Sequence, residues 1–228
     1  MKQLFSFLIL LTLPFLSWSQ TYEVGGFIGG ANYIGDIGKS TFIKPNNLAL
    51  GGLVKWNRSD RHSFRASVNF AKIQGDDSKA SEARRKERGY KFSNTIKEFN
   101  LGMEFTFWEY DTHSGKPIQT PYLYTGITTF MHDNLYRDSN DKFVKDGNKV
   151  SFAIPIVLGY KMSLGRQASL GFEIGARYTF TDNLDGSDPN GAGSQHYKFG
   201  NSNFNDWYVF SGINLTFAFG RTPCYSKF

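Results

Sequence analysis

Polar and apolar residues alternate most regularly near the end of the chain, in residues 207–219, W-Y-V-F-S-G-I-N-L-T-F-A-F. Because successive side chains of a β-strand point to opposite faces, this run predicts a strand with one apolar face. That face carries Trp207, Val209, Ile213, Leu215, Phe217 and Phe219, interrupted only by Ser211. The opposite face consists mostly of small or polar residues.

The same alternation recurs seven more times along the chain. The stretches are residues 22–33, 48–56, 62–73, 95–109, 122–131, 150–164 and 168–180. Residues 168–180 alternate most cleanly, whereas residues 122–131 mix aromatic, aliphatic and Thr residues on both faces. Pro155 cannot donate a ladder hydrogen bond, so it predicts a bulge or a missing bond within 150–164. We therefore expect eight strands.

The connections between these strands alternate in length. Residues 58–61 and 165–167 form tight links, and residues 110–121 form one of middle length. Residues 34–47, 74–94, 132–149 and 181–206 are longer and more polar. This alternation is typical of outer-membrane proteins and predicts an all-β fold, an eight-stranded antiparallel transmembrane β-barrel with short periplasmic turns and longer extracellular loops. The alternative, a soluble β-sandwich, gives no reason for it.

The first residues predict the compartment. Lys2 precedes an apolar run over residues 4–16, and Ser17 and Ser19 stand at the −3 and −1 positions of a cleavage site before Gln20. Residues 1–19 are therefore predicted to be a removed secretory signal, with the barrel over 20–219 and a periplasmic tail over 220–228. An even number of strands would put both termini on the periplasmic side of the outer membrane.

Composition is compatible with such a barrel. Aromatic residues make up 17% of the chain, and there are 24 glycines. The mean hydropathy of −0.39 looks soluble. However, polar lumen residues and loops dilute the apolar face of a membrane barrel.

The inward-facing positions include four acids and four bases. They are Glu23, Glu98, Glu104 and Glu173, and Lys55, Arg65, Lys161 and Arg177. Buried charges are tolerated when paired, and an eight-stranded barrel is just wide enough to be filled by side chains. We expect a plugged, ion-paired lumen; a proton or ion path is the alternative. Aromatic girdles are expected from Trp56, Trp108, Tyr110, Phe217 and Phe219 at one rim and from Tyr178, Phe180 and Trp207 at the other.

Candidate catalytic and metal-binding residues are few. His132 and His196 have Ser139, Ser187 and Ser194 nearby in sequence, but no spacing indicates a triad, so we expect no enzyme and no cofactor. Asp182, Asp185 and Asp188 lack the glycine and terminal Glu of a calcium loop and are expected to be solvated, with no metal. The basic residues 78–88 could form a short helix that meets lipopolysaccharide, or a solvated loop.

The run E-V-G-G-F-I-G-G-A-N-Y-I-G-D-I over residues 23–37 resembles the opening of the PorG-like barrel family of Bacteroidetes. Its N-Y-I-G-D segment, Asn32 to Asp36, carries most of the resemblance, and the leader ending in Ser-Gln and the R-T-P-C tail fit as well. The resemblance implies a non-enzymatic component of the type IX secretion and gliding machinery. It would anchor a periplasmic ring built from a PorK-like lipoprotein and a PorN-like partner.

Two functions follow as hypotheses. In the first, the chain anchors that ring through its periplasmic surface. In the second, it is a free-standing OmpX-like barrel whose outer loops act in adhesion or lipopolysaccharide contact. No nucleic acid partner is expected.

The tail is the candidate partner-binding element. Cys224 is the single cysteine of the chain, and a lone cysteine in an exported protein suggests an intermolecular disulfide or a free thiol. Arg221, Pro223, Tyr225, Lys227 and Phe228 surround it and would dock on the partner.

Overall fold

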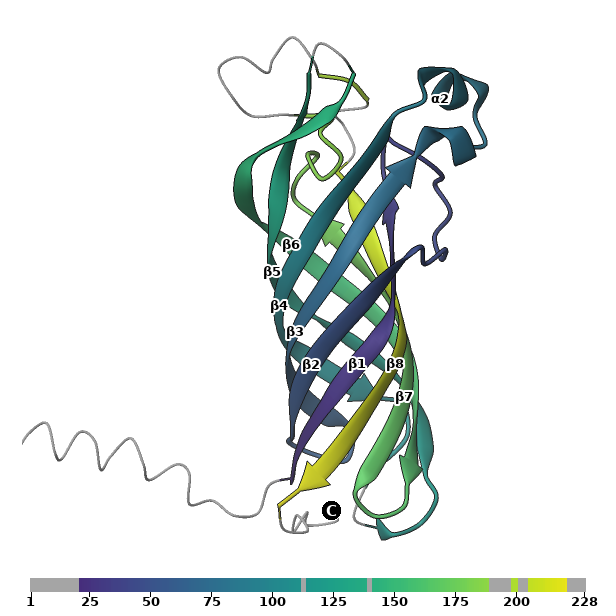
Figure 1. Ribbon diagram of the computed structural model, residues 1–228. Coiled ribbons are helices and arrows are strands. Elements are labelled where there is room, and N and C mark those ends of the chain that lie inside the picture. Colours follow the sequence, from purple (N-terminus) through teal and green to yellow (C-terminus); the bar gives the residue numbers. More distant parts are fainter. Residues whose placement is uncertain (1–20, 112–113, 139–140, 189–197, 201–204, 221–228) are drawn as a thin grey trace, which may run out of the picture.

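The computed structural model describes residues 21–111, 114–138, 141–188, 198–200 and 205–220. It contains eight strands and two short helices (Figure 1). The strands are β1 (Thr21–Ile34), β2 (Asn47–Asn57), β3 (His62–Asp76), β4 (Lys91–Thr106), β5 (Gln119–Arg137), β6 (Phe143–Leu164), β7 (Ala168–Thr179) and β8 (Trp207–Phe219). A 3₁₀ helix, η2 (Asp77–Lys79), and an α-helix, α2 (Ala83–Arg88), lie between β3 and β4.

Each strand pairs with its sequence neighbours, and β1 pairs with β8 to close the barrel. All pairs are antiparallel, and Tyr22 of β1 stands opposite Trp56 of β2 and Phe219 of β8. Closure leaves no unpaired sheet edge where all eight strands pair, as a membrane-spanning sheet requires. The outer ends of β4 and β6, before Lys97 and Ala153, extend beyond this part and pair on one side only. The predicted eight-stranded antiparallel barrel is confirmed.

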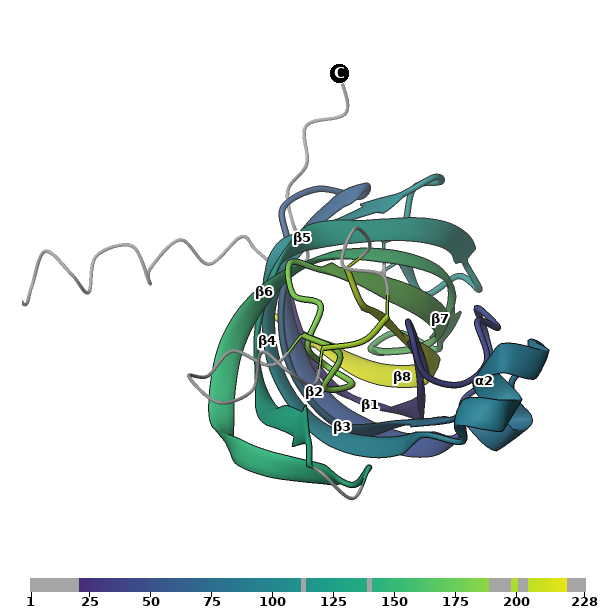
Figure 2. The same ribbon diagram turned by 90° about the horizontal axis from the view of Figure 1, so that it is seen from above.

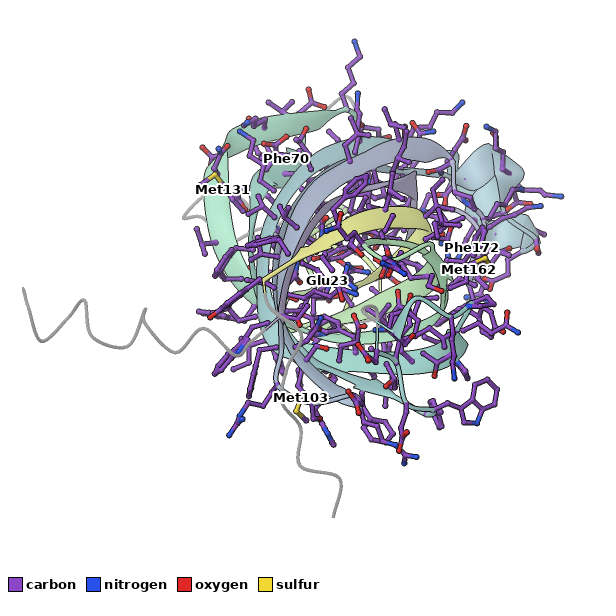
Figure 3. All side chains as sticks on the ribbon, turned by 90° about the horizontal axis from the view of Figure 1, so that it is seen from below. Glu23, Phe70, Met103, Met131, Met162 and Phe172 are labelled. Atoms are coloured by element: carbon purple, nitrogen blue, oxygen red, sulfur yellow. The ribbon has the colours of Figure 1, made fainter. Side chains whose placement is uncertain are left out.

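The outward face of the wall is apolar. Val24, Ile28, Leu50, Val54, Val68, Leu101, Ile127, Phe152, Leu158, Phe172, Ile174 and Leu215 are all between 39% and 67% exposed. Figure 3 shows Phe70, Met103, Met131 and Phe172 around the outside and Glu23 inside the ring of strands. A water-soluble protein rarely exposes so continuous an apolar surface, whereas a membrane barrel must. Val209 is an exception to the predicted exposed face, since it is fully buried.

Strands β5 and β6 are longer than the sequence pattern indicated. They continue beyond residues 122–131 and 150–164 as a hairpin, so the link between them shrinks from the predicted 132–149 to residues 138–142. The pairing shifts register between Asp133 and Leu135, which ends the regular alternation there. The additional residue pairs, such as Tyr136 with Val144, therefore do not follow the alternation of apolar and polar residues from which the strands were predicted.

The short links lie at the same end of the molecule as the start of β1 and the end of β8. β1 begins and β8 ends at the bottom of Figure 1, where the links 58–61, 107–118 and 165–167 also lie. The other four links lie at the opposite end, called the outer end here. The predicted signal, residues 1–19, and the tail from Arg221 onward lie outside the described residues.

The aromatic rims are partly as expected. Trp108, Phe217, Phe219 and Phe180 are each more than half exposed, and Tyr178 packs against Trp207 with ring centroids 4.9 Å apart. Tyr110 was wrongly predicted to join a girdle. It is 7% exposed and turns into the barrel, where its hydroxyl donates to Ser169 Oγ at 2.8 Å.

Neither helix in the described part of the chain is long and apolar enough to cross a membrane.

Candidate functional site: a filled lumen and a covered outer mouth

The lumen holds all eight charged residues named from the sequence. Glu23, Lys55, Arg65, Glu98, Glu104, Lys161, Glu173 and Arg177 point inward and are at most 7% exposed. They come from six of the eight strands, so the network ties the wall together across its interior. Four acids face four bases, and the set is formally neutral.

Glu104 on β4 binds two lysines at once. Lys55 Nζ lies 2.8 Å from Glu104 Oε2, and Lys161 Nζ lies 2.7 Å from Oε1. The lysines also face aromatic rings, since Lys161 Nζ is 4.4 Å from the centroid of Tyr110. Glu23 lies close enough to add a second negative charge to this group of two ammonium ions and one carboxylate.

Arg65 and Glu173 form a two-point ion pair across the barrel. The Nη1–Oε2 and Nη2–Oε1 distances are 2.8 and 3.0 Å. Tyr122 donates its hydroxyl to Glu173 at 2.8 Å, and Asn214 donates its amide at 3.1 Å. The carboxylate thus accepts bonds from β3, β5 and β8 while belonging to β7.

Glu98 and Glu23 occupy the two ends of this network. Glu98 accepts hydrogen bonds from Arg177 at 3.0 Å and from Tyr208 at 2.7 Å. Glu23 differs, because its two oxygens accept from the neutral groups of Asn57 and Thr216, each at 2.8 Å. Within the described residues, no lysine or arginine nitrogen lies within ion-pair distance of Glu23.

The outer half of the lumen is an apolar core that the charge pattern did not reveal. Its buried side chains are Phe27, Ala31, Tyr33, Ile37, Ala49, Ala71, Ile73, Phe92, Ile96, Phe130, Leu135, Ala153, Leu184, Tyr208 and Phe210. Leu184 belongs to the segment between β7 and β8, which turns back into the mouth (Figure 2). The lumen is therefore filled by ion pairs in one half and by apolar side chains in the other.

Asp206 fastens the segment 182–188 inside the mouth, and Asp185 makes a hydrogen bond within that segment. Asp206 accepts one hydrogen bond from the hydroxyl of Tyr33 and a second from the Leu184 amide at 2.9 Å. Asp185 accepts from the Ser187 amide at 2.9 Å. Burial, reinforced by the charge of Asp185, raises the pKa of Asp206 well above its ordinary value.

These acids are not solvated, so the expectation for Asp185 was wrong. Asp185 is fully buried, and burial raises its pKa to about 6. Burial and the nearby charge of Asp36 raise the pKa of Asp182 to about 7. Asp188 pairs with Lys198. Among the residues the structure describes, no group of three or more His, Cys, Asp or Glu is arranged to hold a metal ion.

Part of the basic segment 78–88, residues 83–88, forms the short helix α2, as the sequence suggested. However, two of its arginines are structural. Arg85 Nη1 donates to the carbonyls of Gly35 and Gly38 at 3.0 Å each. Arg88 donates to the carbonyl of Asp36 at 2.6 Å and pairs with Asp77 at 2.8 Å. They hold the segment 35–46 between β1 and β2.

Of the two candidate histidines, the structure describes His132, which is buried at the outer end of the lumen. Its Nε2 lies 3.0 Å from Ser151 Oγ, and its Nδ1 faces the backbone carbonyl of Asp133 at 3.1 Å. No carboxylate orients the ring in this arrangement. Ser187 is also buried and donates to the carbonyl of Asp182. Ser139, Ser194 and His196 lie outside the described residues.

Comparison with known proteins places this chain in a family. A model described as a domain of unknown function, DUF6089, matches residues 2–227. The chain belongs to the DUF6089 family. No curated protein sequence matches it.

Solved structures similar to this DUF6089 chain include outer-membrane barrels. Ail, the attachment invasion locus protein of Yersinia pestis, is 5% identical over 88% of this chain and 99% of its own, with a TM-score of 0.49. The N-terminal barrel domain of Pseudomonas aeruginosa OprF is 10% identical over 88% and 98%, with a TM-score of 0.44. OprG from Pseudomonas aeruginosa is 10% identical over 89% and 97%, with a TM-score of 0.45. At these values the likeness says nothing about function.

The partner-binding residues named from the DUF6089 sequence have no described position. Arg221, Pro223, Cys224, Tyr225, Lys227 and Phe228 all lie beyond Gly220. By contrast, the segment Asn32 to Asp36, which carries the resemblance, lies at the outer mouth. Tyr33 accepts a hydrogen bond from the Asp36 amide at 3.2 Å while its hydroxyl donates to Asp206. The sequence alone drew attention to this motif but did not indicate that Tyr33 would hydrogen-bond to Asp206 across the outer mouth.

Proposed function

We propose that this protein is a non-enzymatic outer-membrane barrel that acts as an anchor and not as a channel. The filled lumen is the observation that carries the proposal. Its charged residues are buried and, apart from Glu23, ion-paired, its outer half is apolar, and the segment 182–188 packs into the mouth. A barrel of this kind offers two working surfaces, its periplasmic end and its outer loops.

The apolar outer wall supports insertion in a membrane. Burying the exposed face of a side chain such as Ile127, 67% exposed, in lipid recovers roughly 25 cal/mol per Å² of apolar surface. The predicted signal over residues 1–19 supports export. The first and last strands begin and end at the same end of the barrel, which agrees with a periplasmic location for both termini.

For the anchored partner we propose the periplasmic ring of the type IX secretion machinery. The support is the resemblance of residues 23–37 to PorG-like barrels. A PorK-like lipoprotein would contact the turn predicted over residues 110–121 and the tail 220–228, and a PorN-like protein would complete the ring. Cys224 would form a disulfide with the lipoprotein, with Arg221, Pro223, Tyr225, Lys227 and Phe228 docking around it.

Copurification from native membranes in mild detergent tests this partner. We expect the tagged barrel to retain a periplasmic lipoprotein, and a chain truncated after Gly220 to lose it while still folding. A free-standing OmpX-like barrel, the second candidate, would carry no lipoprotein in either form. Heat-modifiable migration on gels reports folding in both.

A further inference from the structure

A cavity of about 540 Å³ opens at the outer end, between the segment 35–46 and the ends of β1, β3 and β4. Four lysines line it: Lys39, Lys44, Lys79 and Lys91. The single acid in the lining is Asp76, and it is already engaged. Lys91 Nζ lies 3.2 Å from its carboxylate, and the hydroxyl of Ser78 donates to it at 2.6 Å. The other three lysines pair with no acid among the described residues, so the cavity carries excess positive charge.

Residues 41–44 of the segment 35–46 are held against the outward face of β1, whereas Ile37 of the same segment is buried in the apolar core of the lumen. Asn32 lies on the same face of β1 as Val24 and Ile28, yet it is only 3% exposed because the segment covers it. Its Nδ2 donates to the carbonyls of Thr41 and Phe42 at 3.3 and 3.2 Å, and its Oδ1 accepts from the Lys44 amide at 3.2 Å. The bonds from Arg85 and Arg88 brace the other side. The cavity wall is therefore held in place by specific hydrogen bonds.

Apolar residues flank the lysines on this segment. Phe42 and Ile43, between Lys39 and Lys44, are 52% and 49% exposed. They precede β2 in the chain, whose outer end carries another exposed apolar residue, Leu48, at 60% exposure. Figure 1 shows the segment, in dark purple, beside the barrel wall below α2. This puts the lysines where an apolar belt gives way to polar loops.

We propose that this cavity binds the phosphate of a lipid headgroup in the outer leaflet. Lysine ammonium groups bind phosphate as point charges, and a basic pocket beside a membrane-embedded surface is suited to an anionic headgroup. Phe42 and Ile43 enter the acyl region below it. The proposal rests on the outer-membrane location and orientation proposed above but not on any periplasmic partner, so failure of the ring assignment leaves it standing.

Binding of diphosphorylated lipid A to the purified full-length barrel in neutral detergent tests the site. We expect the triple variant Lys39→Gln, Lys44→Gln, Lys79→Gln to bind at least tenfold more weakly. A charge-matched control, Lys86→Gln, Lys116→Gln, Lys142→Gln, removes three exposed lysines outside the cavity and should bind as wild type. Equal losses in both variants, or none in the first, would overturn the site.

Two further arms separate the lipid from a free anion. Dephosphorylated lipid A should bind wild type as weakly as lipid A binds the cavity variant. Inorganic phosphate at millimolar concentration should not displace lipid A, and Phe42→Ser with Ile43→Ser should weaken lipid A binding severalfold. Complete displacement by phosphate, with no effect of the Phe42 and Ile43 changes, would make the ligand a soluble anion and contradict the lipid assignment. Heat-modifiable migration confirms that each variant is folded.

Discussion

Arg65 on β3 and Glu173 on β7 join opposite parts of the wall through two parallel hydrogen bonds of 2.8 and 3.0 Å. Both side chains are buried, at 4% and 7% exposure. Their pairing joins opposite walls at the centre of the barrel. Substitutions at these two residues therefore measure most directly how much the ion pairs of the lumen stabilise the fold.

Arg65→Met should destabilise the barrel by roughly 3–5 kcal/mol, because it leaves the Glu173 charge buried and unpaired. The double variant Arg65→Met with Glu173→Met removes both charges and should lose less than the single change. Urea unfolding in lipid vesicles, followed by tryptophan fluorescence, gives both values. A double variant that loses the full sum of the two single changes would show that the residues do not interact.

A separate prediction concerns the outward, apolar face of the wall at Ile174, which is 39% exposed in the middle of β7. Ile174→Arg should cost roughly 2–4 kcal/mol when the barrel is in a bilayer, since it places a charge in hydrocarbon. Asn148→Arg, at an exposed position in the β5–β6 hairpin, is the control and should change stability by less than about 0.5 kcal/mol. Similar values at both positions would show that β7 does not face lipid.

The segment 182–188 should be held more firmly at low pH. The pKa values of Asp182 and Asp185 are raised to about 7 and about 6, and burial raises that of Asp206 well above its ordinary value. A carboxyl with a raised pKa binds its proton more tightly in the docked segment than in a released one. Docking is therefore most stable below the ordinary carboxyl pKa of about 4 and weakens as pH rises through 6 and 7.

Hydrogen exchange at the amides of Leu184 and Ser187 measures this docking. Both amides donate to the acids concerned, Leu184 to Asp206 and Ser187 to Asp185. Their protection, corrected for intrinsic exchange, should fall between pH 5 and pH 8. Asp182→Asn should flatten the dependence. Protection that rises with pH would mean that these acids are ionised in the docked state.

The tail makes a prediction of its own. In extracts from intact cells under thiol-trapping, non-reducing conditions, the protein should migrate as a larger adduct that collapses on reduction. The adduct should be absent in Cys224→Ser. Such a bond needs α-carbons within roughly 4.4–6.8 Å, so it would report a docked tail. A wild-type protein that runs only as monomer would leave any contact of the tail non-covalent.

Much of the wall was predictable because lipid and lumen impose opposite demands on alternate residues. Along β7, Leu170, Phe172 and Ile174 alternate with Ser169, Gly171 and Glu173, and this period of two is unambiguous. The same parity places the eight charged residues inside. On β5 the rule fails, because Tyr122, Tyr124 and Phe130 fill the lumen while Ile127 and Met131 face outward. Apolar residues on both faces hide the period.

The outer mouth could not be predicted for a different reason. Asp185 and Asp206 lie in polar stretches that look solvated, and only the fold of the segment 182–188 buries them. Tyr33 and Asp206 are 173 positions apart, so no local pattern indicates their hydrogen bond. The motif at Asn32 to Asp36 was visible as a resemblance, but its structural task appears only in three dimensions. Asn32 fastens residues 41–44 on the outward face of β1, while Tyr33 reaches into the mouth.

Planar-bilayer recording of the purified protein tests the claim of a filled, non-conducting anchor most directly. A porin inserted under the same conditions provides the positive control, and insertion of the barrel is checked by its protection from added protease. We predict that bilayers containing the inserted barrel show no steady open channel at either polarity. A stable, large conductance from the folded wild-type protein would contradict the account.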